Sequence, residues 1–286
     1  MICDEEEFNF YLGTHRPQWL HTAPIEVSLF LSHQVLRKRK SPYAKAPAGR
    51  HYAVDSGAFS EIADHGRFTT SPKEYVEALI RYDEEIGDIA WAAPQDMMCE
   101  PFMLAKTGLT LERHLHRTVE NFALVEQLWD ESGAPGDCPI MPVLQGWKLK
   151  HYWRCYRLYE QAGIRLDQYP IVGVGSVCRR QRSDEIGLIF RELASADLPL
   201  HGFGVKVLGL RKYGRWLVTA DSMAWSTRGR RTPTECGSLT HKNEANCMTF
   251  ALAWRERVLR AVGDARSDRA PMFHQAPLID VEELAV

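Results

Sequence analysis

The most informative stretch is His51-Tyr52-Ala53-Val54-Asp55-Ser56-Gly57-Ala58-Phe59, which begins with an apolar run that ends in Asp55. A small residue and a glycine follow, and glycine permits a sharp turn of the backbone. An apolar run without alternation is typical of a parallel strand that is buried on both faces. The stretch therefore indicates a buried strand that presents the Asp55 carboxylate at its carboxyl end.

Three later stretches have the same form. Asp96 ends the first, Gln145-Gly146 ends the second, and Asp221 ends the third, each after a short apolar run. In parallel α/β folds, functional side chains gather where the strands end. We therefore expect these residues to share one site with Asp55. The alternative for each of them is a turn or helix-capping residue, which requires no common site.

The composition is that of an ordinary globular protein. The chain has 286 residues, 45% hydrophobic and 25% charged, which is enough for one large barrel domain or two smaller domains. A formal net charge of −2 gives no global basic footprint. This does not exclude nucleic acid as a partner, because a local basic patch is sufficient for binding.

Cysteine usage and the first residues bear on the cellular compartment. The seven cysteines are odd in number and mostly scattered, at Cys3, Cys99, Cys138, Cys155, Cys178, Cys236 and Cys247. No apolar signal segment follows the acidic residues Asp4–Glu7, and no apolar run approaches the roughly 20 residues of a membrane span. We therefore expect a reduced, cytoplasmic protein with no membrane partner.

Strand candidates alternate with helix candidates along the chain. Strands are expected at Phe8–Gly13, Glu26–Ser32, the run before Asp55, Ile89–Asp96, Pro139–Gly146, Pro170–Val177, Phe203–Val207 and Leu217–Asp221. Helices are expected after the cap Ser71 and at Leu111–Trp129, Leu149–Gly163, Ile186–Leu193 and Cys247–Val262. This rhythm predicts an α/β fold, a (β/α)8 TIM-like barrel, with residues 1–263 as one domain and residues 264–286 as a peripheral tail. A doubly wound open sheet is the alternative.

The strand ends resemble a known family. Asp55-Ser56-Gly57-Ala58-Phe59 is similar to the DSGGF motif of tRNA-guanine transglycosylases, and Leu144-Gln145-Gly146 resembles their VQGG stretch. Gly173-Val174-Gly175 lies where they have a glycine-rich strand end, and Ala220-Asp221-Ser222 lies where they have the nucleophilic aspartate. The order matches over roughly residues 8 to 260. With Gly13-Thr14-His15 and Pro94-Gln95-Asp96 included, the set resembles the DNA-modifying, DpdA-type relatives more closely.

This resemblance implies that the chain exchanges guanine in DNA for a 7-deazaguanine base such as preQ0. Asp221 is implied as the nucleophile on C1′ of the sugar, and Asp55 as the general acid and base. Asp96 is implied to bind the N1 and N2 donors of guanine, while Gln145 and the Gly146 amide hold its O6 side. The other base-binding residues that the resemblance implies are Ser56, Gly57, Phe59, Gly173 and Gly175.

Elementary chemistry agrees with these roles. A covalent intermediate lets a site swap bases without hydrolysis, and a carboxylate suits attack on an oxocarbenium-like carbon. Burial beside a second carboxylate raises one pKa of such a pair, as an acid/base group requires. Two departures from the tRNA enzymes, Trp147 after Gly146 and Lys206 on the next strand, leave the pocket wall around the 7-substituent open.

A cysteine and histidine cluster precedes the last expected helix. Cys236, His241 and Cys247 lie within twelve residues, and Glu244 lies between the last two. Structural zinc is held by four protein ligands, and a carboxylate can replace a cysteine, so we expect a structural zinc ion here. The alternative is a small buried Cys247 on the helix stripe and an unrelated Cys236. The cysteine pattern of the tRNA enzymes is absent.

Basic residues cluster after several strands, at Arg37–Lys40, Arg179–Arg182, Arg211–Arg215 and Arg228–Arg231. In a barrel these clusters surround an acidic centre, an arrangement that suits a polyanion whose single base enters the pocket. The expected DNA contacts are Arg180, Arg182, Arg228, Arg230 and Arg231. The alternative for each basic run is a solvated face without a partner.

Several functions are compatible with the sequence, and a DNA-guanine transglycosylase is favoured. A tRNA-guanine transglycosylase has nearly the same pocket, and deoxyribosyl transfer or glycoside hydrolysis also uses paired carboxylates. A non-catalytic nucleic-acid-binding barrel requires no convergence of Asp55 and Asp221. The sequence leaves open which deazapurine is inserted, which DNA context is read and whether partner subunits are needed. It gives His15 no role.

Overall fold

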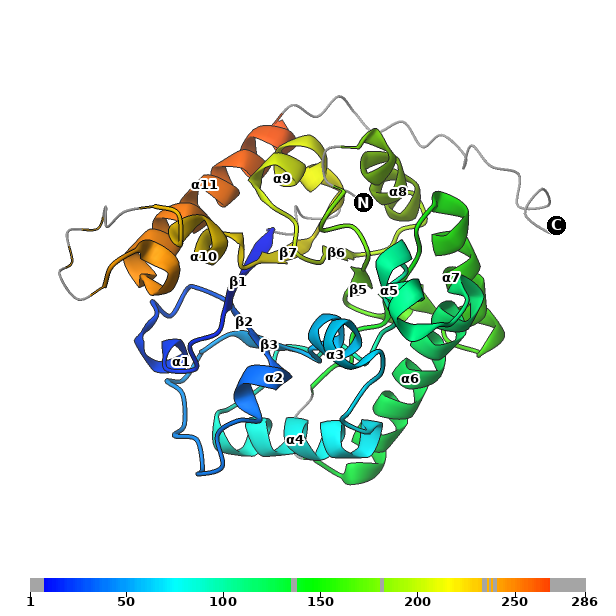
Figure 1. Ribbon diagram of the computed structural model, residues 1–286, viewed down its shortest axis with the longest axis horizontal. Helices are drawn as coiled ribbons and strands as arrows, with labels where there is room; N and C mark the ends of the chain where they lie inside the picture. Colours follow the sequence, from blue (N-terminus) through cyan, green and yellow to red (C-terminus); the bar gives the residue numbers. More distant parts are fainter. Residues whose placement is uncertain are drawn as a thin grey trace, which may run out of the picture.

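A single all-parallel sheet organises the computed structural model, which describes residues 8–134, 138–180, 183–232, 236, 238 and 241–267. The strands are β1 (Asn9–Thr14), β2 (Leu29–Ser32), β3 (Tyr52–Asp55), β4 (Val143–Leu144), β5 (Val172–Val174), β6 (Leu200–Gly202) and β7 (Thr219–Ser222). Their order in the sheet is β3-β2-β1-β7-β6-β5-β4. Figure 1 shows the curled sheet at the centre of the molecule, with helices arranged around it.

Helices connect the strands and cover the outside of the sheet. They are α1 (Trp19–Thr22), α2 (His33–Leu36), α3 (Ala58–His65), α4 (Pro72–Glu85), α5 (Pro101–Thr107), α6 (Leu111–Ser132), α7 (Leu149–Gln161), α8 (Asp184–Ala194), α9 (Val207–Tyr213), α10 (Ala224–Gly229) and α11 (Met248–Ser267). Three short 3-10 helices lie at Leu166–Gln168, Gly214–Trp216 and Glu244–Asn246. The short helices α3 and α5 contact each other and lie inside the ring of longer helices in Figure 1.

The expected long helices are confirmed. Ser71 caps α4 in a capping box, because its hydroxyl accepts from the Glu74 amide and the Glu74 carboxylate accepts from the Ser71 amide. Thr110 caps α6, and Gly133 ends it in the left-handed conformation. The expected domain boundary at residue 263 lies inside α11, which ends at Ser267, and residues 268–286 lie outside the described residues.

The expected strand Ile89–Asp96 is present only as isolated parallel bridges. Ala92 bridges Val54 on one side and Ile140 on the other, so this segment lies between β3 and the residues that precede β4. Pro94 in this segment and Pro139 opposite it lack the N–H that a regular ladder requires. The described residues therefore form a curled seven-stranded sheet, and the eight-stranded barrel is not confirmed.

The expected strand Phe203–Val207 is wrong. The strand in this region is β6, which ends at Gly202, and Val207 already begins α9. Gly204 has a φ of +61°, a left-handed conformation that ends an extended strand. The apolar residues after it therefore belong to a turn and a helix, although their sequence resembles a buried strand.

Side chains alternate between the two faces of the sheet, as strand geometry requires. One face supplies the small inner core, formed by Tyr11, Phe30, Ala53, Trp91, Ala93, Met141, Val143 and Ile171. The other face packs against the surrounding helices in a much larger core, to which Phe10, Leu12, Leu29 and Leu31 belong. The inner core lies directly beneath the polar side chains at the carboxyl ends of the strands. Among the described residues, no helix is long and apolar enough to cross a membrane.

The turn after β3 generates a prediction about stability. Gly57 has a φ of +80°, and a Cβ added there would lie 2.4 Å from Cγ of Gln34 and 3.1 Å from Oγ of Ser32. Gly49 has nearly the same φ of +79°, but a Cβ added there would have nothing within 4 Å. Both alanine variants lose about 1–2 kcal/mol to the left-handed backbone, and Gly57→Ala is expected to lose about 1–3 kcal/mol more to overpacking.

Urea denaturation of both variants measures this difference in the free energy of unfolding. Gly49→Ala is the matched control, because it carries the backbone cost alone. Equal losses in the two variants would show that Gln34 moves aside at no cost, which contradicts the prediction.

Candidate active site

Asp55 and Asp221 border the same cavity, which has a volume of about 520 Å³. Asp55 ends β3 and Asp221 lies in β7, and the two strands are separated in the sheet by β2 and β1. The cavity is also lined by Gly13, Thr14, His15, Phe30, Ser32, Gln34, Val35, Lys38, Ser60, Glu61, Asp64, His65 and Met223. Two of the three acids that the sequence singled out are thus brought together at one edge of the sheet.

The Asp55 carboxyl can hold a proton near neutral pH. Burial raises its pKa to about 6, and the negative charge of Asp221 acts in the same direction. Hydrogen bonds from the Gly57 amide and the Ser32 hydroxyl oppose this shift. Ser32 is the register partner of Asp55 on β2, so the parallel ladder itself places this hydroxyl beside the carboxylate.

Asp221 accepts hydrogen bonds from a backbone amide and from a histidine that sequence reasoning missed. The Gly204 amide lies 2.8 Å from Oδ1 of Asp221, and Nε2 of His201 lies 3.3 Å from the same oxygen. His201 is fully buried, and its Nδ1 lies 2.8 Å from Oγ1 of Thr219. The available signal was a histidine inside the apolar run from Leu198 to Phe203, where burial without a partner is costly.

Asp96 and Gln145 form a second, buried group. Gln145 Nε2 donates to Asp96, and Ser176 Oγ lies 2.7 Å from Gln145 Oε1 and 2.8 Å from Glu100 Oε2. Burial raises the pKa of Asp96 to about 7, and the negative charge of Asp55 also raises it. The hydrogen bond from Gln145 lowers the pKa and so opposes this shift. The structure therefore joins the expected amide and acid directly, and it does not place them among the residues that line the cavity.

Ser176 is a further residue that sequence reasoning missed. Its φ of +57° is left-handed, a conformation that is uncommon for a residue with a side chain and marks a constrained position. The constraint aims its hydroxyl at Gln145 and Glu100, and the Cys99 amide donates to it over 2.8 Å. The sequence feature that points to Ser176 as a site residue is its position directly after Gly173-Val174-Gly175.

Side chains of the protein occupy the space beside the three expected base-binding glycines. A Cβ on Gly146 would lie 2.8 Å from Tyr152, one on Gly173 would lie 2.6 Å from Phe203, and one on Gly175 would lie 2.1 Å from the Gln145 amide. Ser56 is buried, whereas Phe59 is 37% exposed on α3. Contact of these residues with a base stays a prediction.

The expected phosphate-binding arginines differ in their surroundings. Arg180 donates to the Trp147 carbonyl, pairs with Glu185 and stacks over the Trp147 ring at 4.0 Å from its centroid. Arg228, Arg230 and Arg231 are exposed at the end of α10 and just beyond it. Arg182 lies outside the described residues.

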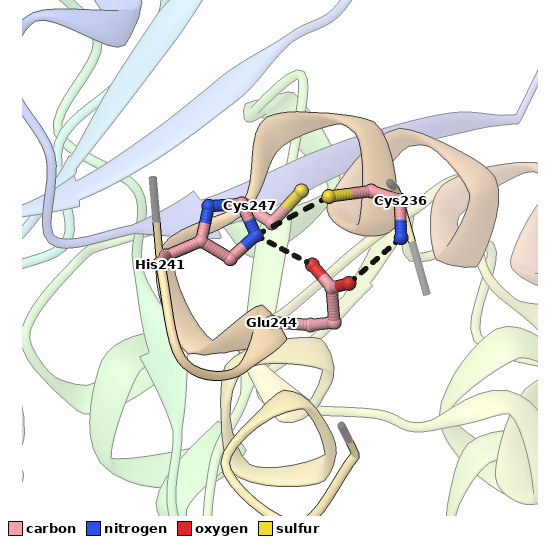
Figure 2. Close-up of side chains that lie close together, drawn as sticks. All are labelled: Cys236, His241, Glu244 and Cys247. Carbon is pink, nitrogen blue, oxygen red and sulfur yellow. Dashed lines mark hydrogen bonds and ion pairs between the residues drawn. The ribbon is translucent and has the colours of Figure 1, made fainter. Parts of the chain in front are cut away.

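Cys236, His241, Glu244 and Cys247 form a cluster whose four ligand atoms all lie within 4.8 Å of one another (Figure 2). Nε2 of His241 lies 3.2 Å from Sγ of Cys236 and 3.1 Å from Oε2 of Glu244. These separations are near the about 3.5 Å expected between ligands of a tetrahedral zinc ion. The Glu244 side chain is fully buried among soft and nitrogen ligands, so the donor set fits a metal ion.

The raised pKa of Asp96 generates a prediction about pH. The carboxyl titrates near 3.8 when unfolded and near 7 when folded, so the folded state binds more protons between these values. Wild-type stability therefore falls as the pH rises through this window. Asp96→Asn removes the titration and keeps an oxygen for Gln145. Its free energy of unfolding relative to wild type is expected to increase by at least about 1 kcal/mol between pH 4 and pH 8.

Urea denaturation at a series of pH values checks this expectation. Asp130→Asn, at an exposed position on α6, is the matched control and is expected to show no such pH-dependent gain. A constant difference between Asp96→Asn and wild type across the series would contradict the prediction.

Comparison with known proteins identifies the family of the chain. No curated protein matches the chain. A family model described as "DpdA: DeoxyPurine in DNA protein A" matches residues 6–285, nearly the whole length of the chain. DpdA is a family of DNA-guanine transglycosylases. The chain belongs to the DpdA family.

Proposed function

We propose that this protein exchanges guanine in DNA for a 7-deazaguanine base such as preQ0, through a covalent aspartyl-sugar intermediate. The observation that carries the proposal is the pair Asp55 and Asp221, which border one cavity in a chain of a DNA-modifying family. The fold that we propose for it is a (β/α)8 barrel, in which the segment around Ala92 takes the place of the eighth strand between β3 and β4.

In the first half of the reaction, Asp221 attacks C1′ of the target deoxyguanosine through a carboxylate oxygen. The C1′–N9 bond breaks, its electron pair goes to the base, and Asp55 gives its proton to the departing guanine. The raised pKa of Asp55, about 6, supports this role because the carboxyl is protonated in an appreciable fraction of molecules near neutral pH. The product is an ester between Asp221 and the sugar.

In the second half, the incoming base attacks C1′ of the ester through N9. Asp55, now ionised, takes the N9 proton, and the ester bond breaks to release the Asp221 carboxylate. Both carboxyl groups thus return to their starting states, and one base replaces another without water.

The Asp96–Gln145 pair supports recognition of a purine, since a carboxylate accepts from the N1 and N2 donors and an amide contacts the O6 side.

DNA is the proposed acceptor polymer, and its guanine is flipped into the cavity. The exposed Arg228, Arg230 and Arg231 support contact with phosphates. Arg180 and Arg182 are further proposed contacts, on the basis of the basic run from Arg179 to Arg182 in the sequence. A base held by Asp96 and Gln145 lies close to Ser56, Gly57 and Phe59 and to the glycines at 146, 173 and 175 in this proposal. Partner subunits are not required by the chemistry.

Zinc is the metal proposed for the Cys236, His241, Glu244 and Cys247 cluster. Two thiolates, an imidazole and a carboxylate complete a four-coordinate shell, which is typical of a structural site without an open position. The ion would join the residues after α10 to the start of α11, and it would supply no group to the reaction.

The mechanism predicts that Asp221→Ala, Asp221→Asn and Asp55→Ala each lower base exchange by at least about 1,000-fold. Alanine removes the attacking or proton-transferring group, and asparagine is a poor nucleophile. Asp64→Asn changes another acid that borders the same cavity, on α3, and is the matched control that keeps most of the activity.

Labelled guanine or deazaguanine, offered with DNA or with tRNA, measures the exchange directly. The expected result is label in DNA. Label in tRNA alone would overturn the choice of polymer, and near-normal turnover in Asp221→Ala would overturn the mechanism.

The metal proposal predicts about one zinc ion per chain in protein purified without chelator. Elemental analysis is the measurement. Cys236→Ala and Cys247→Ala are expected to lose the metal, while Cys178→Ala, a change outside the cluster, is expected to keep it. Metal-free wild-type protein, or full occupancy in both cluster variants, would contradict the assignment.

A further inference from the structure

His201 lies in line with Asp221 on the inner face of the sheet. His201 on β6 is the register partner of Thr219 on β7, so their side chains lie on the same face. Asp221 follows Thr219 by two residues and therefore shares this face. The imidazole thus lies between the Thr219 hydroxyl at the start of β7 and the Asp221 carboxylate near its end.

The contacts of His201 define where its protons lie. Its Nε2 is 3.3 Å from Oδ1 of Asp221, and an ionised carboxylate only accepts hydrogen bonds, so Nε2 must carry the proton. The Thr219 hydroxyl, 2.8 Å from Nδ1, can donate to the other ring nitrogen. The opposite arrangement would face a lone pair of the imidazole against the carboxylate.

Aromatic side chains enclose the imidazole. The ring centroids of Trp91 and Phe203 each lie 4.8 Å from that of His201, and those of Phe30 and Tyr11 lie 6.2 Å and 6.3 Å away. The ring is fully buried in this enclosure, and such close packing restricts its rotation. The His201 imidazole is therefore held in one orientation, with its Nε2–H directed at Asp221.

Both hydrogen bonds to the Asp221 carboxylate, among the residues that the structure describes, end on Oδ1. The Gly204 amide is the second donor, at 2.8 Å, in the left-handed turn after β6. Two donors on one oxygen fix the plane of the carboxylate and leave Oδ2 as the oxygen that can approach a ligand in the cavity.

We infer that His201 is a positioning residue that holds Asp221 by Oδ1 and directs Oδ2 at C1′ of the nucleotide. This inference rests on the proposed function, because it takes Asp221 as the nucleophile. When Oδ2 forms the ester, Oδ1 becomes the carbonyl oxygen and keeps both donors. When the ester breaks, the same donors stabilise the carboxylate that leaves, so His201 acts in both halves of the exchange.

Three variants separate this role from simple packing. His201→Phe keeps a ring of similar size in the aromatic enclosure and removes both nitrogens. His201→Gln keeps an N–H near the position of Nε2, and Thr219→Val removes only the hydroxyl that contacts Nδ1. His21→Gln, at an exposed histidine, is the matched control.

The expected result is a kcat that falls about 10- to 100-fold in His201→Phe, with an unchanged KM for the free base. His201→Gln is expected to recover part of this loss, and Thr219→Val to show a smaller one. A kcat equal to that of His21→Gln in all three variants would overturn the inference.

Nitrogen NMR of the wild-type histidines gives a readout that needs no activity. The His201 signals are expected to show protonated Nε2 and to shift in Asp221→Asn. A ring protonated at Nδ1 alone, or signals unmoved by Asp221→Asn, would overturn the inference even if His201→Phe failed to fold. A wild-type protein that exchanges no base yet shows the expected NMR signals would refute the proposed function and leave the His201–Asp221 contact established.

Discussion

The parallel register of β7, β1, β2 and β3 is the constraint on which the site depends. Because the four strands run in one direction, their carboxyl ends meet at one edge, and residues far apart in the chain become neighbours there. Asp221 faces Tyr11 across one ladder, and Asp55 faces Ser32 across another. Two carboxylates separated by 166 positions in sequence thus border one cavity, where the negative charge of Asp221 raises the cost of ionising Asp55.

The four acids at this edge of the sheet fall into two groups with different surroundings. Asp55 and Asp221 border the cavity, whereas Asp96 and Glu100 lie in a buried chain with Gln145 and Ser176. The surroundings differ accordingly. Asp221 has two N–H donors on one oxygen, whereas burial raises the pKa values of Asp55 and Asp96 despite the hydrogen bonds that each accepts. Similar side chains therefore lie in different electrostatic surroundings, as the different roles proposed for them require.

Local patterns in the sequence predicted the features that depend on neighbouring residues. The cap at Ser71, the apolar strand before Asp55 and the donor set of Cys236, His241, Glu244 and Cys247 are all visible in short windows. Asp55 was correctly predicted to end a strand, whereas Asp96 follows a segment with isolated bridges only, and Asp221 precedes the last residue of β7. It misplaced the strand at Phe203–Val207, because the left-handed turn at Gly204 interrupts an apolar run without changing its composition. His201 and Ser176 were missed because their partners come from other strands and loops, and only the register brings them together.

The hydrogen bond between Gln145 and Asp96 would compete with a base at the proposed purine site. The amide proposed to meet one edge of a base and the carboxylate proposed to meet its donors satisfy each other in the structure. A base that binds there must break this hydrogen bond and form new hydrogen bonds both to the Gln145 amide and to the Asp96 carboxylate. A base that forms only one of the two therefore gains little net binding free energy. Discrimination between bases would then depend more on this exchange of hydrogen bonds than on the shape of the cavity. A base that donates to the acid but offers no acceptor to the amide would leave Gln145 buried and unpaired.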